Sequence, residues 1–316
     1  MNGTHLNGLE GTNPLGFLAA LGIQVAFASK PEQPSLWWSD DITPHAIIDN
    51  DFSIERISEQ ALKIFAEWKD SPALNPKRID DSTMDKGDEL KFASSDIRLY
   101  LKRGCQCSSS GALASALVAE GSIDRKGEAK PSDLYFTAGQ QKFLDMARQI
   151  LGGVSQEEVL TGLRGPWSYK SQLPSLMWDI SDDRVYALTA DDPAKDKKLT
   201  NPGPEALAIL GLSLYPVFAG RGRTLTQGCS GSWKNGYYSW PLWYKPARPH
   251  SVKSLLTHAS VPDQQPMNTD RYHWFCSWSI SKILRSEIRR SSQGGYGTFA
   301  PSDVIWQDQR NTTLKK

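Results

Sequence analysis

Two apolar segments with the same opening constrain the fold more than any other feature of this sequence. Residues 13–22 and 201–211 both start with Asn-Pro and continue with small apolar residues up to a glycine. Asparagine can accept hydrogen bonds from the free backbone donors of a helix start, and proline fits the first helical turn. The pattern predicts two capped apolar helices, each leading toward a strand-like region. Duplication and convergence on the same helix-start chemistry both explain the similarity.

Other segments predict further helices and an antiparallel hairpin. Apolar residues recur at helical spacing after Ser53 and predict an amphipathic helix that ends near Trp68. Residues 70–95 are polar and contain two prolines, which favours a surface loop. Asn235-Gly236 lies between aromatic strand formers and predicts a hairpin with a two-residue turn. Together these segments indicate an α+β fold of mixed helices and antiparallel sheet, in two loosely similar halves.

The last predicted helix covers residues 274–292 and ends before Gly294-Gly295, a natural helix stop. Its apolar residues fall on one side at helical spacing: Ile280, Ile283, Leu284 and Ile288. We therefore expect this helix to pack one side against the core and to expose the other.

Length and composition favour a folded protein of two parts. The chain has 316 residues, of which 39% are hydrophobic and 22% are charged. A chain of this length is enough for roughly two domains. The polar run at residues 191–198 is the natural boundary. We expect an acidic, helical or mixed part over residues 1–195 and a basic, aromatic-rich α+β part over residues 196–316.

Charge is unevenly distributed between these parts. Residues 201–316 contain 14 Lys and Arg against 6 Asp and Glu, whereas residues 1–200 contain 22 against 29. The same C-terminal stretch holds six of the eleven tryptophans. Cations interleaved with aromatic rings suit a nucleic-acid surface, because the cations bind phosphates and the rings stack on bases. An acidic protein partner, or a Trp-rich core with a solvated basic face, would give the same composition.

Catalytic signatures are absent, so we do not expect an enzyme, a cofactor or a metal site. Residues 164–171 lack the glycines that a phosphate-binding loop requires. Cys105 and Cys107 are separated by one residue and lack a second ligand pair, which argues against zinc. The rival hypothesis is a Mg²⁺-dependent nuclease that uses Asp40, Asp41 and His45. A second rival is a scaffold subunit that binds only proteins.

The sequence also argues against export and membrane insertion. The first basic residue, Lys30, follows the only long apolar stretch, residues 15–28, which is too short to cross a bilayer. We therefore expect a cytoplasmic protein with no membrane partner.

The strongest candidates for nucleic-acid binding are cations on the last predicted helix. Lys282, Arg285 and Arg289 are spaced i, i+3, i+7, which places them on one helical face. Arg290 and Gln293 lie beside that face. An aligned row of cations of this kind can bind a phosphate chain.

A second candidate patch combines Arg221 and Arg223 with the tip of the predicted hairpin, Lys234 and Asn235. Arginine, lysine and asparagine bind phosphates or read base edges. Tyr169 and Lys170 are further candidates for contacts with a nucleic-acid backbone.

Four segments resemble type I-G (formerly I-U) CRISPR-associated proteins. They are the opening LEGTNPLGFLAALG at residues 9–22, YFTAGQQ at residues 135–141, residues 201–216, and SWPLW at residues 239–243. These motifs are short and largely structural, and they are spread over most of the chain.

The resemblance implies a non-catalytic subunit of the large-subunit kind in a Cascade-like ribonucleoprotein complex of antiviral defence. Such subunits bind target DNA beside the protospacer-adjacent motif and lie near the 5′ end of the guide RNA. At 35.1 kDa the chain is small for a large subunit. The resemblance therefore implies a reduced large subunit or an accessory protein, with guide RNA, target DNA and other CRISPR subunits as partners.

Overall fold

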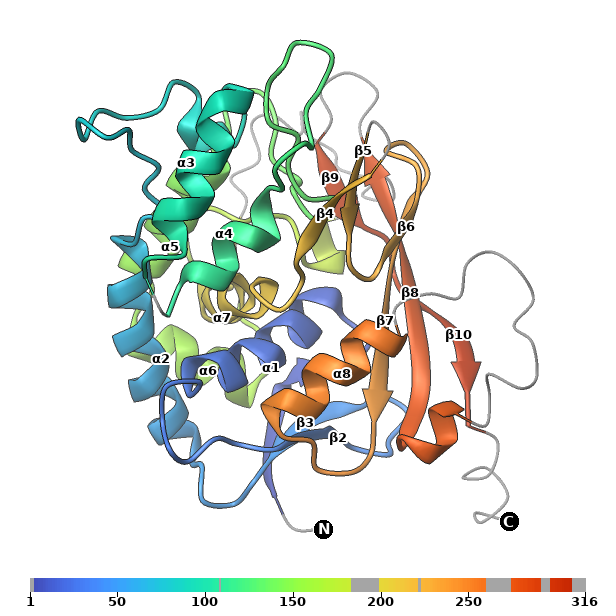
Figure 1. The fold of residues 1–316 in the computed structure, drawn as a ribbon. Coiled ribbons are helices and arrows are strands. Elements are labelled where there is room, and N and C mark those ends of the chain that lie inside the picture. Colours follow the sequence, from blue (N-terminus) through green and yellow to red (C-terminus); the bar gives the residue numbers. More distant parts are fainter. Residues whose placement is uncertain are drawn as a thin grey trace, which may run out of the picture.

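A computed structural model of the chain describes residues 3–107, 109–182, 199–220, 223–259, 274–290 and 296–308 (Figure 1). Helices and antiparallel strands confirm the predicted α+β class. None of the described helices is both long and apolar enough to span a bilayer. The helices are α1 (Pro14–Ala26), α2 (Ile54–Lys69), α3 (Ser94–Gly104), α4 (Gly111–Leu117), α5 (Phe143–Gly153), α6 (Gln156–Arg164), α7 (Pro202–Leu212) and α8 (Pro249–Ala259), with 3-10 turns η1 (Gly87–Glu89) and η2 (Ile180–Asp182).

The strands form three small antiparallel sheets. β3 lies between β1 and β2, and β4 pairs with β5. In the largest sheet the order is β10-β8-β7-β6, and β9 also pairs with β8. Figure 1 shows this sheet beside the helical part, with α8 next to β7. The strands are β1 (Thr4–Glu10), β2 (Leu36–Trp38), β3 (His45–Ile48), β4 (Val217–Gly220), β5 (Arg223–Thr226), β6 (Cys229–Gly231), β7 (Gly236–Trp243), β8 (Ile280–Arg290), β9 (Gly297–Phe299) and β10 (Asp303–Gln307).

The two segments with the shared opening are α1 and α7, and they pack directly against each other. A Cβ atom at Gly22 would lie 1.9 Å from the carbonyl oxygen of Leu207, and one at Gly211 would lie 2.0 Å from that of Leu18. Each leucine precedes the glycine of its own helix by four residues, so the two contacts are reciprocal. Only glycine permits this close backbone approach.

The two helix starts are bonded differently. Asn13 Oδ1 accepts a hydrogen bond from the backbone N–H of Leu15, which confirms the predicted cap of α1. The predicted cap at Asn201 is wrong. Its Oδ1 accepts instead from the backbone N–H groups of Ser168 and Tyr169, and so it ties the preceding loop to α7.

One hydrophobic core includes residues of both predicted parts, 1–195 and 196–316. Trp240 Nε1 donates to Gly11 O at 2.8 Å, and Trp243 Nε1 donates to Leu36 O at 2.6 Å. Both rings also pack near Phe17. The alternative of a Trp-rich core therefore holds for these two tryptophans. The predicted boundary at residue 195 lies outside the described residues.

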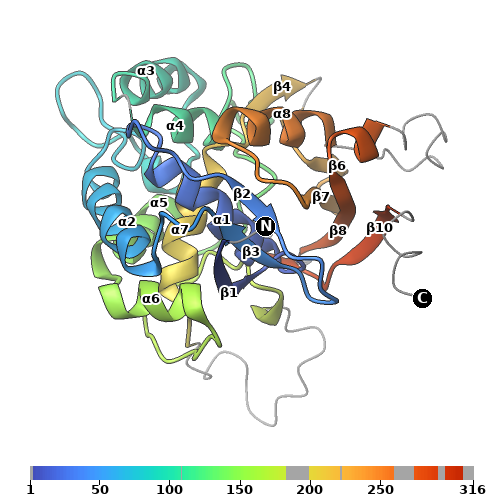
Figure 2. The same cartoon turned by 90° about the horizontal axis from the view of Figure 1, so that it is seen from below.

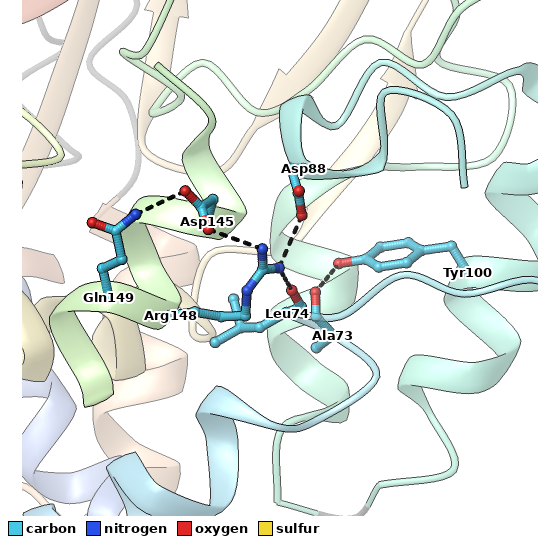
Figure 3. A network of polar contacts seen from close by, with 7 residues as sticks. All are labelled: Ala73, Leu74, Asp88, Tyr100, Asp145, Arg148 and Gln149. Carbon is cyan, nitrogen blue, oxygen red and sulfur yellow. Dashed lines mark hydrogen bonds and ion pairs between the residues drawn. The ribbon is translucent and has the colours of Figure 1, made fainter. Parts of the chain in front are cut away.

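The predicted surface loop at residues 70–95 is anchored by buried polar contacts (Figure 3). Arg148 of α5 donates to Leu74 O at 2.5 Å and lies 2.9 Å from an Asp88 carboxylate oxygen. The hydroxyl of Tyr100 donates to Ala73 O at 2.6 Å. The loop is therefore held between α3 and α5, although its sequence is polar.

The last predicted helix is wrong beyond its first turn. Residues 274–277 are helical, but residues 280–290 form β8, the central strand of the largest sheet. Leu284, Ser286 and Ile288 are buried while the residues between them are less so, which is the two-residue period of a strand. Ile283 is buried on the opposite face, where its cross-strand neighbour Trp306 packs against Phe275. Apolar residues on both faces at this end of the strand imitate helical spacing.

The predicted hairpin is confirmed as β6 and β7, but its turn differs. Gly231 pairs with Gly236, which leaves a four-residue loop, residues 232–235. Gly231, at the end of β6, takes a positive φ of 84°. The loop is closed by a hydrogen bond from Ser232 N–H to Asn235 O at 3.1 Å.

Candidate nucleic-acid interface

The three cations predicted to share a helical face are divided between the two faces of β8. Arg285 and Arg289 lie on the outward face with Glu287 between them, and Lys282 lies on the other face. Arg289 Nε is 3.0 Å from Glu287 Oε2, and Lys282 Nζ is 3.5 Å from Asp41 O. Arg285 Nε donates to Ser239 Oγ at 3.1 Å. The predicted cationic row therefore does not form.

The side chain of Arg290 is bound by other groups of the protein. Its guanidinium donates to Tyr135 O at 3.1 Å and to Asp133 O at 2.6 Å, and it lies 3.6 Å from the centroid of the Trp233 ring. Burial lowers the pKa of Arg290 to about 10, while the Asp133 carboxylate opposes this shift. The adjoining hollow encloses only about 50 Å³. Pockets for ligands are typically several times larger, roughly 300–1,000 Å³.

The hairpin tip presents part of the second predicted patch. Trp233 is 40% exposed, and Lys234 and Asn235 are also exposed. No ion pair joins Lys234 to any residue that the structure describes. Arg223 lies in β5, but its side chain is not among those that the structure describes. Arg221 and Gln293 lie outside the described residues.

Tyr169 and Lys170 lie near acidic groups. The hydroxyl of Tyr169 donates to Asp179 Oδ2 at 2.8 Å, and burial, followed by the Asp179 charge, raises the pKa of Tyr169. Lys170 is exposed and lines a groove with Glu157 and Glu158. Nearby carboxylates disfavour phosphate, so this pair is a weaker candidate than the sequence indicated.

The residues of the rival nuclease do not converge. Asp40, Asp41 and His45 lie in or beside the loop between β2 and β3. Among the described residues, no three His, Cys, Asp or Glu side chains are placed to hold a metal ion. These three residues therefore form no metal centre.

The most suitable surface lies elsewhere, along α8 and the segment that precedes it (Figures 1 and 2). Lys245, Arg248 and Lys253 are exposed, and none forms an ion pair within the described part of the chain. Beside them, α8, the end of β7 and residues 277–279 enclose a groove of about 430 Å³. We call it the α8 groove. It is lined by Lys245, serines 251, 254, 277 and 279, Trp278 and four apolar or proline residues, and none of the described carboxylates lines it.

Cation spacing did not predict this surface, although the sequence carries a signal for it. Residues 206–262 contain no Asp or Glu, whereas they contain Lys245, Arg248 and Lys253. A long acid-free run guarantees that its cations have no acidic neighbours close in sequence. The helical spacing in residues 274–292 instead directed attention to cations that the fold pairs or buries.

No family model matches the chain, and no curated protein matches its sequence.

Proposed function

We propose that this protein is a non-catalytic nucleic-acid-binding subunit of a type I CRISPR guide-RNA surveillance complex. In this role it contacts target DNA near the protospacer-adjacent motif, guide RNA, or both. The observation that carries nucleic-acid binding is the surface along α8, where exposed cations have no carboxylate partner among the described residues. The identity of the complex rests on the sequence resemblance at residues 9–22, 135–141, 201–216 and 239–243.

Unpaired, exposed cations are what a phosphate chain requires. Each phosphate that Lys or Arg neutralises releases condensed counterions, so binding weakens as salt rises. Lys245, Arg248 and Lys253 are available to phosphates because no described carboxylate pairs with them. In guide-RNA complexes the sequence is read mainly by base pairing, and the protein contributes backbone contacts.

Charge reversal along α8 tests the proposal. The variant Lys245→Glu/Arg248→Glu/Lys253→Glu should bind a fluorescently labelled, single-stranded 20-mer oligonucleotide more weakly than the wild type does. Fluorescence anisotropy across a salt titration measures this binding. For single strands the slope of log K against log salt is about 0.7 per phosphate contact, so losing three contacts should lower its magnitude by about 2.

A matched control makes the same charge change in the acidic part. Lys63, Arg125 and Lys126 are exposed, and their triple change to Glu should leave the slope unaltered. Equal slopes for the two triple variants and the wild type would contradict the proposal.

Purification of the tagged protein separates the rivals. Small RNAs that copurify support the proposal, whereas an acidic protein without nucleic acid supports the scaffold hypothesis. Cleavage of DNA by the isolated chain only when Mg²⁺ is added would support the nuclease hypothesis.

A further inference from the structure

We propose that the α8 groove holds one nucleotide of a single strand, with its base stacked on Trp278 and its phosphate against Lys245. This inference rests on the proposed function and deepens it by naming the site and the form of nucleic acid. The groove volume of about 430 Å³ lies in the range of pockets that enclose small ligands.

The groove places aromatic, hydroxyl and cationic groups next to each other. Ser251, Ser254 and Leu255 of α8 recur at i, i+3, i+4, so one face of the helix forms a wall. Trp278 lines the groove, and Trp274, which is 62% exposed, packs against it at 87° between the ring planes. Lys245 supplies the cation in the lining.

The backbone fixes the position of Trp278. The next residue, Ser279, takes φ 63°, a conformation that non-glycine residues seldom adopt. Two backbone hydrogen bonds hold it there, from Ser279 N–H to Cys276 O at 3.1 Å and from Tyr244 N–H to Ser279 O at 3.0 Å. The ring is therefore presented by a turn that is tied to the end of β7.

The lining favours a single strand and little base selectivity. In a duplex each base is already stacked on its neighbours, so a protein ring can stack only on an unpaired base. Selective recognition of base edges usually relies on Arg, Asn, Gln, Asp or Glu, and none of these is among the described residues that line the groove. Serine hydroxyls can bond to phosphate or sugar without reading a base.

The test uses the full chain with labelled dT and rU 12-mers and a duplex of the same length. Trp278→Ala should weaken single-strand binding about 5- to 150-fold, the range for loss of one stacked base. The salt slope should stay unchanged, because no phosphate contact is lost. Trp278→Phe should retain most of the affinity, and Trp233→Ala, which removes an exposed ring outside the groove, should retain all of it.

A second variant guards against misfolding of Trp278→Ala. Ser254 is exposed, so Ser254→Phe should fill the groove without disturbing the core and should reduce single-strand binding to a similar extent. Wild-type affinity in Ser254→Phe, or in a folded Trp278→Ala, overturns the proposed site. If the triple charge variant still loses binding, the proposed function stands without this site; if no variant loses binding, both fail. Stronger binding of the duplex than of either single strand would also overturn the inference.

Discussion

A single added methyl group at Gly22 should destabilise the protein by forcing α1 and α7 apart. The new Cβ atom would lie 1.9 Å from the carbonyl oxygen of Leu207, whereas ordinary contacts begin near 3.4 Å. The helices would have to separate by about 1.5 Å, the difference between these distances. Both helices are buried, and overpacking of a buried contact costs about 1–3 kcal/mol. A backbone oxygen cannot rotate away, so we take the upper end of this range.

Alanine also favours a helix over glycine by about 1 kcal/mol, which offsets part of that cost. The expected net loss is about 2 kcal/mol. At about 2 °C per kcal/mol for a chain of this size, Tm should fall by about 4 °C, measured by scanning fluorimetry. The matched control is Gly152→Ala at an exposed position of α5, where the new Cβ would lie 3.6 Å from Lys69 Cδ, an ordinary contact. Its Tm should stay constant or rise.

The reciprocal contact gives a sharper test. Gly211→Ala should have a similar effect, because its Cβ would lie 2.0 Å from Leu18 O. Once one substitution has separated the helices, the second meets less resistance. The double variant should therefore lose at least about 0.5 kcal/mol less than the two single losses combined. Additive losses, or a Gly22→Ala protein as stable as the wild type, would refute the crossing described here.

Two further predictions concern buried polar groups. Arg290→Lys should lower Tm, because the compact ammonium lacks the planar fork with which Arg290 reaches both Tyr135 O and Asp133 O. Loss of either bond leaves a carbonyl unsatisfied, which costs about 1–3 kcal/mol when the carbonyl is buried. The salt slope of nucleic-acid binding should not change. Alkaline pH should also destabilise the fold. Burial raises the pKa of Tyr135 to about 12 and raises that of Tyr100 further, so the folded state keeps protons that the unfolded chain loses above about pH 10. The stabilisation that these two tyrosines contribute should be constant below about pH 10 and should fall as pH rises toward 12. Tyrosine absorbance should change in step with unfolding, and ionisation of every tyrosine before unfolding would contradict this.

Local patterns predicted the elements whose residues act within one turn or one helix. Ser53 caps α2 through the N–H of Arg56, and Ser155 with Glu158, three residues later, forms a capping box at the start of α6. The hydrogen bonds of Asn201 depend on residues that are distant in sequence. Its side chain has the right chemistry for a cap, but the loop at residues 168–169 offers it two other donors. No sequence window around Asn201 contains that information.

The secondary structure of β8 also depends on contacts that are distant in sequence. Its apolar residues fit a helix because Ile283 and Leu284 are adjacent and both buried. They are both buried because the sheet is covered on each face at this end, which depends on Phe275 and Trp306 packing there. The local pattern is therefore a consequence of tertiary structure. A helical face of three cations could not survive this change, since a strand sends alternate residues to opposite sides.

The net charge of a segment differs from the charge that it can offer to a ligand, because some cations are engaged within the protein. The excess of cations in residues 201–316 is a fact of composition, but Arg289 pairs with Glu287 and Arg290 is enclosed by carbonyl groups and an aromatic ring. An acid-free stretch lacks the ion partners that neighbouring residues of the same helix or strand would otherwise supply. Residues 206–262 remove that possibility for Lys245, Arg248 and Lys253, and the fold places no distant carboxylate against them within the residues it describes. The proposed binding surface thus lies where the sequence lacks acids, and α8 and the end of β7 form the groove beside it.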